Sequence, residues 1–454
     1  MVSLLDLLTS HYAPVQRMML PCLDIVDVAA LMRTCKGFAQ LQPLLQATVY
    51  NASRFFGQYF SDPIAFRSIQ GQCGALVSGR GVRTFLQRSA HFSPYLQIFV
   101  AASRSRPILE FLKKDGYVVL KKKSGSNVQT FSIVVSRGTK ILLDVFMGEK
   151  AAIAQALMCY PFTASLNFLS WNKVYALFPY STFGKSESYL LRDMDAVKYA
   201  QLEGIVSDGL KFKSVAWTHR EAPEGLNPRH DFTDTLFHQD ADELGELVRI
   251  RRIGDRHTWV VKLDTKGLSV PDIPTSVLES ATFQLRGPHH HGQLSNVAHY
   301  VMDCDCIINH PVLKHQYVTL SLGTQDDDSD ERKARHSYYI RKCQDLNTRL
   351  NELTLIALRG MHTDDRPLHQ YIALKRDISK AATMRGKIDL PASWAFFDDD
   401  VITYLDKAWQ GQQKIDEQER AARNAQVAIS TVGHDSAMQL LQSLLRTVSQ
   451  DLRK

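Results

Sequence analysis

The chain has 454 residues, 44% of them hydrophobic and 22% charged, and its formal net charge is +7. This is an ordinary globular composition, long enough for more than one domain, and its positive charge is too dispersed to indicate a nucleic-acid-binding surface. The cysteines follow no disulfide framework, no apolar run reaches the roughly 18 residues of a membrane-spanning helix, and the first residues lack the pattern of a secretory signal. We therefore expect a soluble protein with free thiols in the cytoplasm or the nucleus.

The pattern of residues 1–49 predicts a group of short helices. A Leu-Pro pair is followed by apolar residues at helical spacing and then by a small residue, Cys and Lys at 34–36. This pattern resembles the F-box, a short helical motif. The resemblance implies an apolar surface that binds the adaptor subunit of a cullin-type ubiquitin ligase. The candidate contact residues are Leu20, Pro21, Leu23, Leu31 and Cys35. The alternative is that the helices only cap the domain behind them, since an amphipathic helix must bury its apolar stripe somewhere.

Residues 50–205 are predicted to form a domain organised around the stretch from Cys73 to Val118. An aromatic-rich helix ending near Asp62-Pro63 and a second helix come first. Apolar residues then lead into the turn at 78–81, a helix-like run follows, and residues 95–100 alternate as a strand does. The order of elements favours a mixed sheet with flanking helices. Further helices are expected at 107–114, 150–159 and 195–203, and further strands at 117–120, 130–135 and 140–146.

The strand, turn, helix and strand of this stretch resemble the nucleotidyltransferase superfamily. In that superfamily a Gly-Ser turn opens a helix, and the next strand carries two carboxylates separated by one residue. Residues 20–205 together resemble a group of fungal proteins in which this fold follows an F-box-like N-terminus. Here the two carboxylate positions hold Tyr95 and Gln97, and the Ser position holds Arg80. Asp144, on a later strand, stands where the superfamily often has its third carboxylate.

Nucleotidyl transfer uses carboxylates to hold two divalent cations against the substrate phosphates. Tyr95 and Gln97 cannot act as anionic oxygen ligands, so we expect neither a metal, nor a cofactor, nor transferase activity. Arg80, at the start of the helix, is expected to turn to solvent or to pair with an acid such as Glu110. The residues of the predicted cleft are Ser78, Gly79, Arg80, Tyr95, Gln97 and Asp144.

The rest of the chain predicts a β-rich extension at 206–325, C-terminal helices at 326–409 and a charged helical tail at 410–454. Within the extension, strands at 249–254 and 258–263 suggest a hairpin that turns at Gly254-Asp255. Cys304 and Cys306 lie near several histidines, which leaves two interpretations: a zinc site with four converging ligands, or two thiols on one face of a strand. The histidines concerned are His289, His290, His291, His299, His310 and His315.

These patterns predict an α+β protein with an F-box-like helical cap, a nucleotidyltransferase-like mixed sheet with flanking helices, a β-rich extension and C-terminal helices. The preferred function is a non-catalytic interaction protein that serves as a substrate adaptor of a cullin-type ubiquitin ligase. Two alternatives stay open, because a fold does not fix a function. One is an enzyme whose carboxylates have moved, with Asp144 and either Asp303 or Asp305. The other is a nucleotide-binding pseudoenzyme that keeps the cleft without the chemistry.

Overall fold

The computed structural model of the chain divides into two compact units. The first comprises residues 1–309 and 315–321, and the second comprises residues 310–314 and 322–454. The structure describes residues 14–15, 18, 23, 27–28, 31, 45–89, 92–124, 130–138, 141–192, 196–213, 249–289, 299–304, 306–320, 338–388, 390–391 and 393–431.

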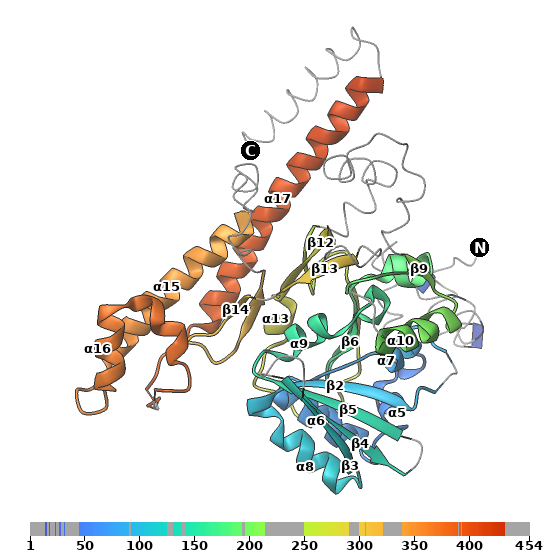
Figure 1. The fold of residues 1–454 in the computed structure, drawn as a ribbon, viewed down its shortest axis with the longest axis horizontal. Coiled ribbons are helices and arrows are strands. Elements are labelled where there is room, and N and C mark those ends of the chain that lie inside the picture. The colour runs from blue at the N-terminus through green and yellow to red at the C-terminus, as the bar shows by residue number, and fades with distance from the viewer. Residues whose placement is uncertain are drawn as a thin grey trace. The chain divides into compact units, whose positions relative to one another are not determined.

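The first unit is built on an eight-stranded sheet (Figure 1) with the strand order β11-β7-β6-β1-β2-β5-β4-β3. Strands β2 and β5 run parallel, and every other neighbouring pair in this sheet is antiparallel. The mixed sheet predicted from the sequence is therefore confirmed. The strands span Leu76–Ser78 (β1), Tyr95–Ala101 (β2), Val118–Ser124 (β3), Thr130–Arg137 (β4), Ile141–Gly148 (β5), Asn167–Leu169 (β6), Lys173–Ala176 (β7) and Trp259–Lys262 (β11).

Helices cover both faces of this sheet. The α9 helix (Ala152–Cys159) lies on one side of it, and α6 and α8 lie on the other (Figure 1). Because side chains alternate along a strand, Leu96 and Ile98 of β2 join the core that contains the aromatic residues of α5 and α6, whereas Phe99 joins the core beneath α9. The helices on the face opposite α9 are α5 (Ala52–Phe56), α6 (Pro63–Cys73), α7 (Arg80–Leu86) and α8 (Arg106–Lys114).

Local sequence explains where α6 begins and ends. The Asp62 side chain accepts a hydrogen bond from the Ala65 backbone N–H at 2.9 Å, which caps the helix. Pro63 occupies the first helical position, where its missing N–H costs nothing. Gly74 ends the helix with a left-handed φ of 61°. The break predicted near Asp62-Pro63 is therefore confirmed.

The extension does not form the predicted hairpin. Strand β10 (Ile250–Arg252) pairs with β12 in a three-stranded sheet of order β10-β12-β13, whereas β11 pairs with β7 at the edge of the main sheet. The chain does turn at Gly254-Asp255, but the two strands on either side of the turn find different partners. The remaining elements of the first unit are the helices α10 (Ala196–Ser207) and α13 (Thr275–Glu279), the short turns η4 (Ala102–Arg104), η5 (Thr163–Ser165) and η6 (Tyr180–Gly184), and the strands β8 (Glu187–Tyr189), β9 (Lys211–Lys213), β12 (Thr282–His289), β13 (His299–Asp303), β14 (Cys306–Ile308) and β15 (Tyr317–Thr319).

The second unit is helical, as predicted. It contains α15 (Tyr338–Gly360), α16 (Leu368–Arg376), the 3-10 helix η8 (Ile378–Met384) and the long helix α17 (Asp398–Thr431). Tyr339 of α15 and Trp409 of α17 meet edge to face, with ring centroids 6.1 Å apart. The part of the predicted helical tail beyond residue 431 lies outside the described residues. In the described part of the chain, no helix is both long enough and apolar enough to cross a membrane.

Candidate functional site

Three of the predicted cleft residues lie in one row across the middle of the main sheet. Ser78 on β1 pairs with Gln97 on β2, and Gln97 pairs with Asp144 on β5. Neighbouring strands lie about 4.8 Å apart, so residues at these register positions are direct neighbours. We call Ser78, Gln97 and Asp144 the central row. Gln97 lies two residues before Phe99 on the same face of β2, and this places the central row on the face that α9 covers.

The turn between β1 and α7, directly after Ser78, requires a glycine at position 79. Gly79 has φ 92° and ψ −161°, a conformation that side chains strongly disfavour. A Cβ added there would lie 2.7 Å from the Gln97 Oε1 atom and 3.4 Å from the Tyr160 hydroxyl. The Ser78 hydroxyl donates to the Asn167 backbone carbonyl on β6 at 2.6 Å. The small residues of this turn therefore serve close packing between strands.

Two tyrosines close the central row by hydrogen bonds. The Tyr95 hydroxyl donates to Asp144 Oδ2 at 3.1 Å, and the Tyr160 hydroxyl donates to Gln97 Oε1 at 2.8 Å. Burial raises the pKa of both phenols, and the Asp144 carboxylate raises that of Tyr95 further. Both hydroxyls therefore keep their protons at neutral pH and act as donors. Burial also raises the pKa of the Cys159 thiol to about 12, which leaves this thiol a poor nucleophile.

Arg80 forms an ion pair, but its partner is not the predicted Glu110. Arg80 and Arg83 both bind the Asp208 carboxylate, one guanidinium to each oxygen. Glu110 pairs instead with Arg106, four residues earlier on α8, at 2.7 Å. Arg80 and Arg83 are three residues apart and share a helix face, so a second cation beside Arg80 was foreseeable. Asp208 was not, because it follows α10 and lies more than a hundred residues away in the chain.

Arg83 differs from Arg80 in its exposure to solvent. Its side chain is 3% exposed, whereas that of Arg80 is 48% exposed. Burial lowers the pKa of the Arg83 guanidinium, and the Asp208 carboxylate opposes that change. A buried cation needs a carboxylate beside it. The ion pair between Arg83 and Asp208 therefore holds the end of α10 against α7.

The central row has one carboxylate and neutral neighbours. Asp144 is 2% exposed and Gln97 is 8% exposed, and Tyr95 reaches solvent with 37% of its surface. A pair of divalent cations needs several hard anionic oxygens around it. Among the described residues, no three His, Cys, Asp or Glu side chains come close enough together to hold a metal ion. The row therefore offers a single buried acid beside an amide and a phenol.

The other predicted metal candidates are dispersed. Cys304 is fully buried in the core beneath α9, and Cys306 opens β14, which pairs with β15 in a separate two-stranded sheet. The expectation that both thiols share one face of a single strand is wrong, because β13 ends at Asp303 before β14 begins. His310 hydrogen-bonds through Nε2 to the Asn347 Oδ1 atom at 2.7 Å. The positions 290, 291 and 305 lie outside the described residues.

Two of the predicted adaptor contacts fall within the described residues. Leu23 and Leu31 are half-buried and pack against the core that contains the aromatic residues of α5 and α6. Val28, between them, is 1% exposed and belongs to that core. These contacts are the ones expected of a helical cap. Leu20, Pro21 and Cys35 lie outside the described residues.

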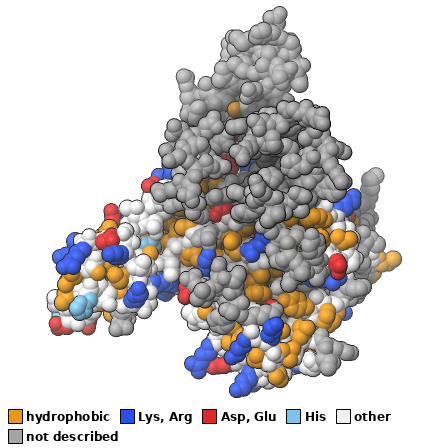
Figure 2. Space-filling view, viewed as in Figure 1, with side chains coloured by type: hydrophobic (Ala, Val, Ile, Leu, Met, Phe, Trp, Pro, Cys, Tyr) orange, Lys and Arg blue, Asp and Glu red, His pale blue; other side chains and the backbone are white. Residues whose placement is uncertain are grey.

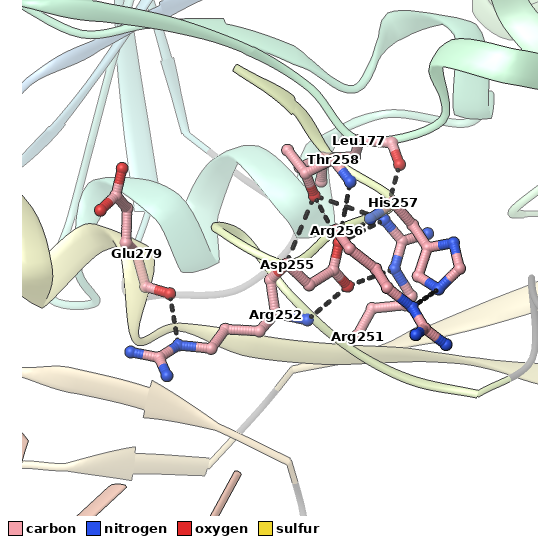
Figure 3. Close-up of polar contacts among 8 residues, drawn as sticks. All are labelled: Leu177, Arg251, Arg252, Asp255, Arg256, His257, Thr258 and Glu279. Atoms are coloured by element: carbon pink, nitrogen blue, oxygen red, sulfur yellow. Dashed lines mark hydrogen bonds and ion pairs between the residues drawn. The ribbon is translucent and has the colours of Figure 1, made fainter. Parts of the chain in front are cut away.

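A second polar cluster lies at the turn between β10 and β11 (Figure 3). Arg251 binds Asp255 through two hydrogen bonds, Nε to Oδ2 at 2.5 Å and Nη2 to Oδ1 at 3.0 Å. Asp255 also accepts from the backbone N–H groups of Arg252, His257 and Thr258. Arg251 donates to a backbone carbonyl as well, that of Leu177, at 3.0 Å.

This cluster is a structural staple. Its ion pair is almost fully buried, with side-chain exposures of 5% for Arg251 and 1% for Asp255. The guanidinium also lies near the Phe178 and Phe283 rings, 5.7 and 5.6 Å from their centroids. The hydrogen bonds of this pair go to backbone groups of the turn and to the Leu177 carbonyl. The pair therefore stabilises the fold and is not a ligand-binding site.

In comparisons with protein-family models, with curated proteins and with solved structures, no match to this chain was found. The function is therefore inferred from the residues of the central row and their contacts.

Proposed function

We propose that this chain is a non-catalytic interaction protein, built on a nucleotidyltransferase-like sheet whose metal-binding carboxylates have been replaced. The observation that carries the proposal is the state of Asp144. Its carboxylate is 2% exposed, accepts a hydrogen bond from Tyr95, and has an amide, Gln97, as its neighbour in the central row. A single buried acid beside an amide does not provide the several anionic oxygens that a pair of divalent cations needs.

The order of elements supports the likeness to nucleotidyltransferases. Strand β1 leads through the Gly79 turn into α7, β2 follows antiparallel to β1, and β5 then lies parallel to β2. This is the strand, turn, helix and strand arrangement on which the resemblance rests. Asp144 lies in β5 directly beside the second of the two replaced positions, where a third carboxylate would join the other two. The lost groups are thus the two that β2 would have supplied.

The partner implied by the F-box-like N-terminus is the adaptor subunit of a cullin-type ubiquitin ligase. Leu23 and Leu31 are half-buried against their own domain, so the N-terminal segment caps the domain whether or not it also binds an adaptor. An adaptor would contact the apolar surface that the cap leaves exposed. The test is affinity capture of the full-length protein with the purified adaptor, comparing native chain with Leu20→Asp. Capture that Leu20→Asp abolishes supports the adaptor role, and no capture by the native chain leaves the segment as a cap alone.

The lack of catalysis is tested by adding a nucleoside triphosphate with and without magnesium. We expect no transfer of the nucleotidyl group and no magnesium-dependent change in melting temperature, because the central row lacks the ligands for the metal pair. Asp144→Asn is the informative variant. Transfer by the native chain that Asp144→Asn abolishes would establish an enzyme with moved carboxylates. A metal-independent, nucleotide-induced rise in melting temperature that Asp144→Asn also abolishes would establish a pseudoenzyme that binds the nucleotide at the central row.

A further inference from the structure

A pocket of about 400 Å³ opens on the face of the main sheet opposite the central row. Its lining comes from the segment before α5, from α5 itself and from the C-terminal end of α7 and the residues that follow it. Its aromatic residues belong to the core on the α5 side of the sheet, not to the core beneath α9. The volume lies within the range of small-molecule sites, roughly 300–1,000 Å³. The pocket is therefore large enough for a small organic ligand and separate from the central row.

The charged residues that line the pocket are both cations. Arg54 and Arg88 are the lining arginines, and the described lining residues include no Asp or Glu. The Arg54 guanidinium makes no ion pair or hydrogen bond with any other described residue. Seven of the remaining lining residues carry hydroxyl or amide side chains: Thr48, Asn51, Gln58, Tyr59, Thr84, Ser89 and Ser93. Guanidinium groups without a competing carboxylate favour a ligand with negative charge.

Arg88 is held in a strained backbone conformation at the pocket. Its φ is 55°, and among the described non-glycine residues Ser186 alone shares a positive φ with it. A glycine would adopt this conformation without strain. The Ser89 backbone N–H donates to the Thr84 carbonyl at 3.0 Å across this residue, so the left-handed turn ends α7. The end of the helix therefore fixes the backbone of Arg88 at the pocket.

The apolar wall of the pocket is rigid. The rings of Phe55 and Phe85 are 5.0 Å apart by their centroids, and the two side chains are 7% and 9% exposed. The Tyr59 hydroxyl, also in the lining, donates to the Ser93 carbonyl at 2.7 Å. A wall fixed by core packing and hydrogen bonds loses little entropy when a ligand binds. A flat ring can lie against this wall.

We propose that this pocket binds a small aromatic anion, with its ring against Phe55 and Phe85 and its carboxylate or phosphate paired with Arg54 and Arg88. The proposal does not depend on the function proposed for the central row, because the two sites lie on opposite faces of the sheet. Carboxylate and phosphate present the same oxygen pair to a guanidinium, so either group satisfies the site.

Phenyl phosphate is the probe that tests this, because it combines a ring with an anion. Isothermal titration should show saturable binding of phenyl phosphate, and weaker binding of inorganic phosphate, which lacks the ring, and of benzyl alcohol, which lacks the charge. Arg54→Gln and Arg88→Gly should each weaken phenyl phosphate binding about tenfold, the effect of losing one charged hydrogen-bonding group. Titration with benzoate compares carboxylate with phosphate.

The matched control is Arg106→Gln. This substitution removes one positive charge from an arginine that is 86% exposed on α8 and does not line the pocket, so binding should be unchanged. Absence of saturable binding by the native chain at millimolar probe overturns the proposal. So does equal binding of benzyl alcohol or inorganic phosphate, or binding that neither pocket variant weakens more than Arg106→Gln does.

Discussion

The substitution Asp255→Asn removes the negative charge of the buried staple and keeps its shape. Arg251 would then remain with 5% of its side chain exposed and no carboxylate beside it. Leaving one charge of a buried pair uncompensated costs about 3–5 kcal/mol. The free energy of unfolding of a domain is roughly 5–15 kcal/mol, so this loss is a large share of the total stability. We expect the urea midpoint of this variant to lie far below that of the native chain. Tryptophan fluorescence measures the transition, and Trp259, which comes directly after Thr258, contributes to that signal.

Burial distinguishes this staple from an exposed pair of the same spacing. Arg106 and Glu110 are also an arginine and an acid four residues apart, but their side chains are 86% and 63% exposed. Glu110→Gln should therefore leave the unfolding free energy unchanged within error. The double variant Arg251→Met, Asp255→Asn should recover part of the stability that Asp255→Asn loses, because it leaves no buried cation. An unfolding free energy of Asp255→Asn within about 1 kcal/mol of the native value would mean that Arg251 does not need its buried partner.

The same pair predicts a dependence of stability on pH. Burial alone would raise the pKa of Asp255, but the Arg251 guanidinium and the hydrogen bonds from the turn outweigh burial and hold it below its usual value of 3.8. A carboxylate with a lowered folded pKa stabilises the fold fully above the unfolded pKa and loses that contribution as pH falls through the folded one. The native chain should therefore lose stability below about pH 3.8 more steeply than Asp255→Asn does.

Two further predictions concern a glycine and a histidine. Gly79→Ala should lower the melting temperature more than Gly116→Ala. Both glycines have positive φ, but of the two only Gly79 would place the added Cβ against another atom, Gln97 Oε1 at 2.7 Å. Equal losses in melting temperature would mean that φ alone sets the cost. Burial holds the pKa of His310 below 6.5, with the Asn347 hydrogen bond opposing and the Arg385 charge assisting, so the neutral ring is favoured in the fold and stability should fall as pH drops below 6.5; a His310→Gln variant with the same pH profile would contradict this.

Local patterns predicted most elements of the fold. The strand at 95–100 and the helix at 107–114 correspond to β2 and α8, and the C-terminal helices predicted at 326–409 include α15. Each is determined by the spacing of apolar residues and by the turn residues at its ends, which are properties of a short window of sequence. The same holds for the mixed sheet, because alternating strands and helices restrict how strands can pair.

Partners far apart in the chain could not be predicted in this way. Gly254-Asp255 marks a true turn, but β10 and β11 pair with β12 and β7, and nothing within the turn specifies those partners. The ion pair of Arg80 with Asp208 and the hydrogen bond of Tyr160 with Gln97 also join distant segments. The pocket is hidden in the sequence for the same reason, since two separate stretches of the chain, residues 48–59 and 84–93, line it together.

The edge strand of the main sheet carries exposed lysines. Lys121 and Lys122 lie on β3, the edge strand, after the exposed Val118, Val119 and Leu120. Hydrophobic and basic side chains lie next to each other in the region of β3 and α8 (Figure 2). The pairing of β3 with β4 also shifts register between Val119 and Lys121. Charges and irregular pairing at an edge oppose the addition of another strand, so the lysines protect the edge.

The central row is proposed to be a metal site that has lost two of its carboxylates. The double variant Tyr95→Asp, Gln97→Asp would supply two carboxylates beside Asp144, with position 97 paired directly to 144. The variant Tyr95→Asn, Gln97→Asn is the control, because it changes size similarly without adding charge. Each protein is titrated with manganese by calorimetry after its fold is checked by circular dichroism. We predict that the aspartate variant binds the ion while the native chain and the asparagine control do not; a folded aspartate variant that binds no manganese would contradict the nucleotidyltransferase-like placement of the row.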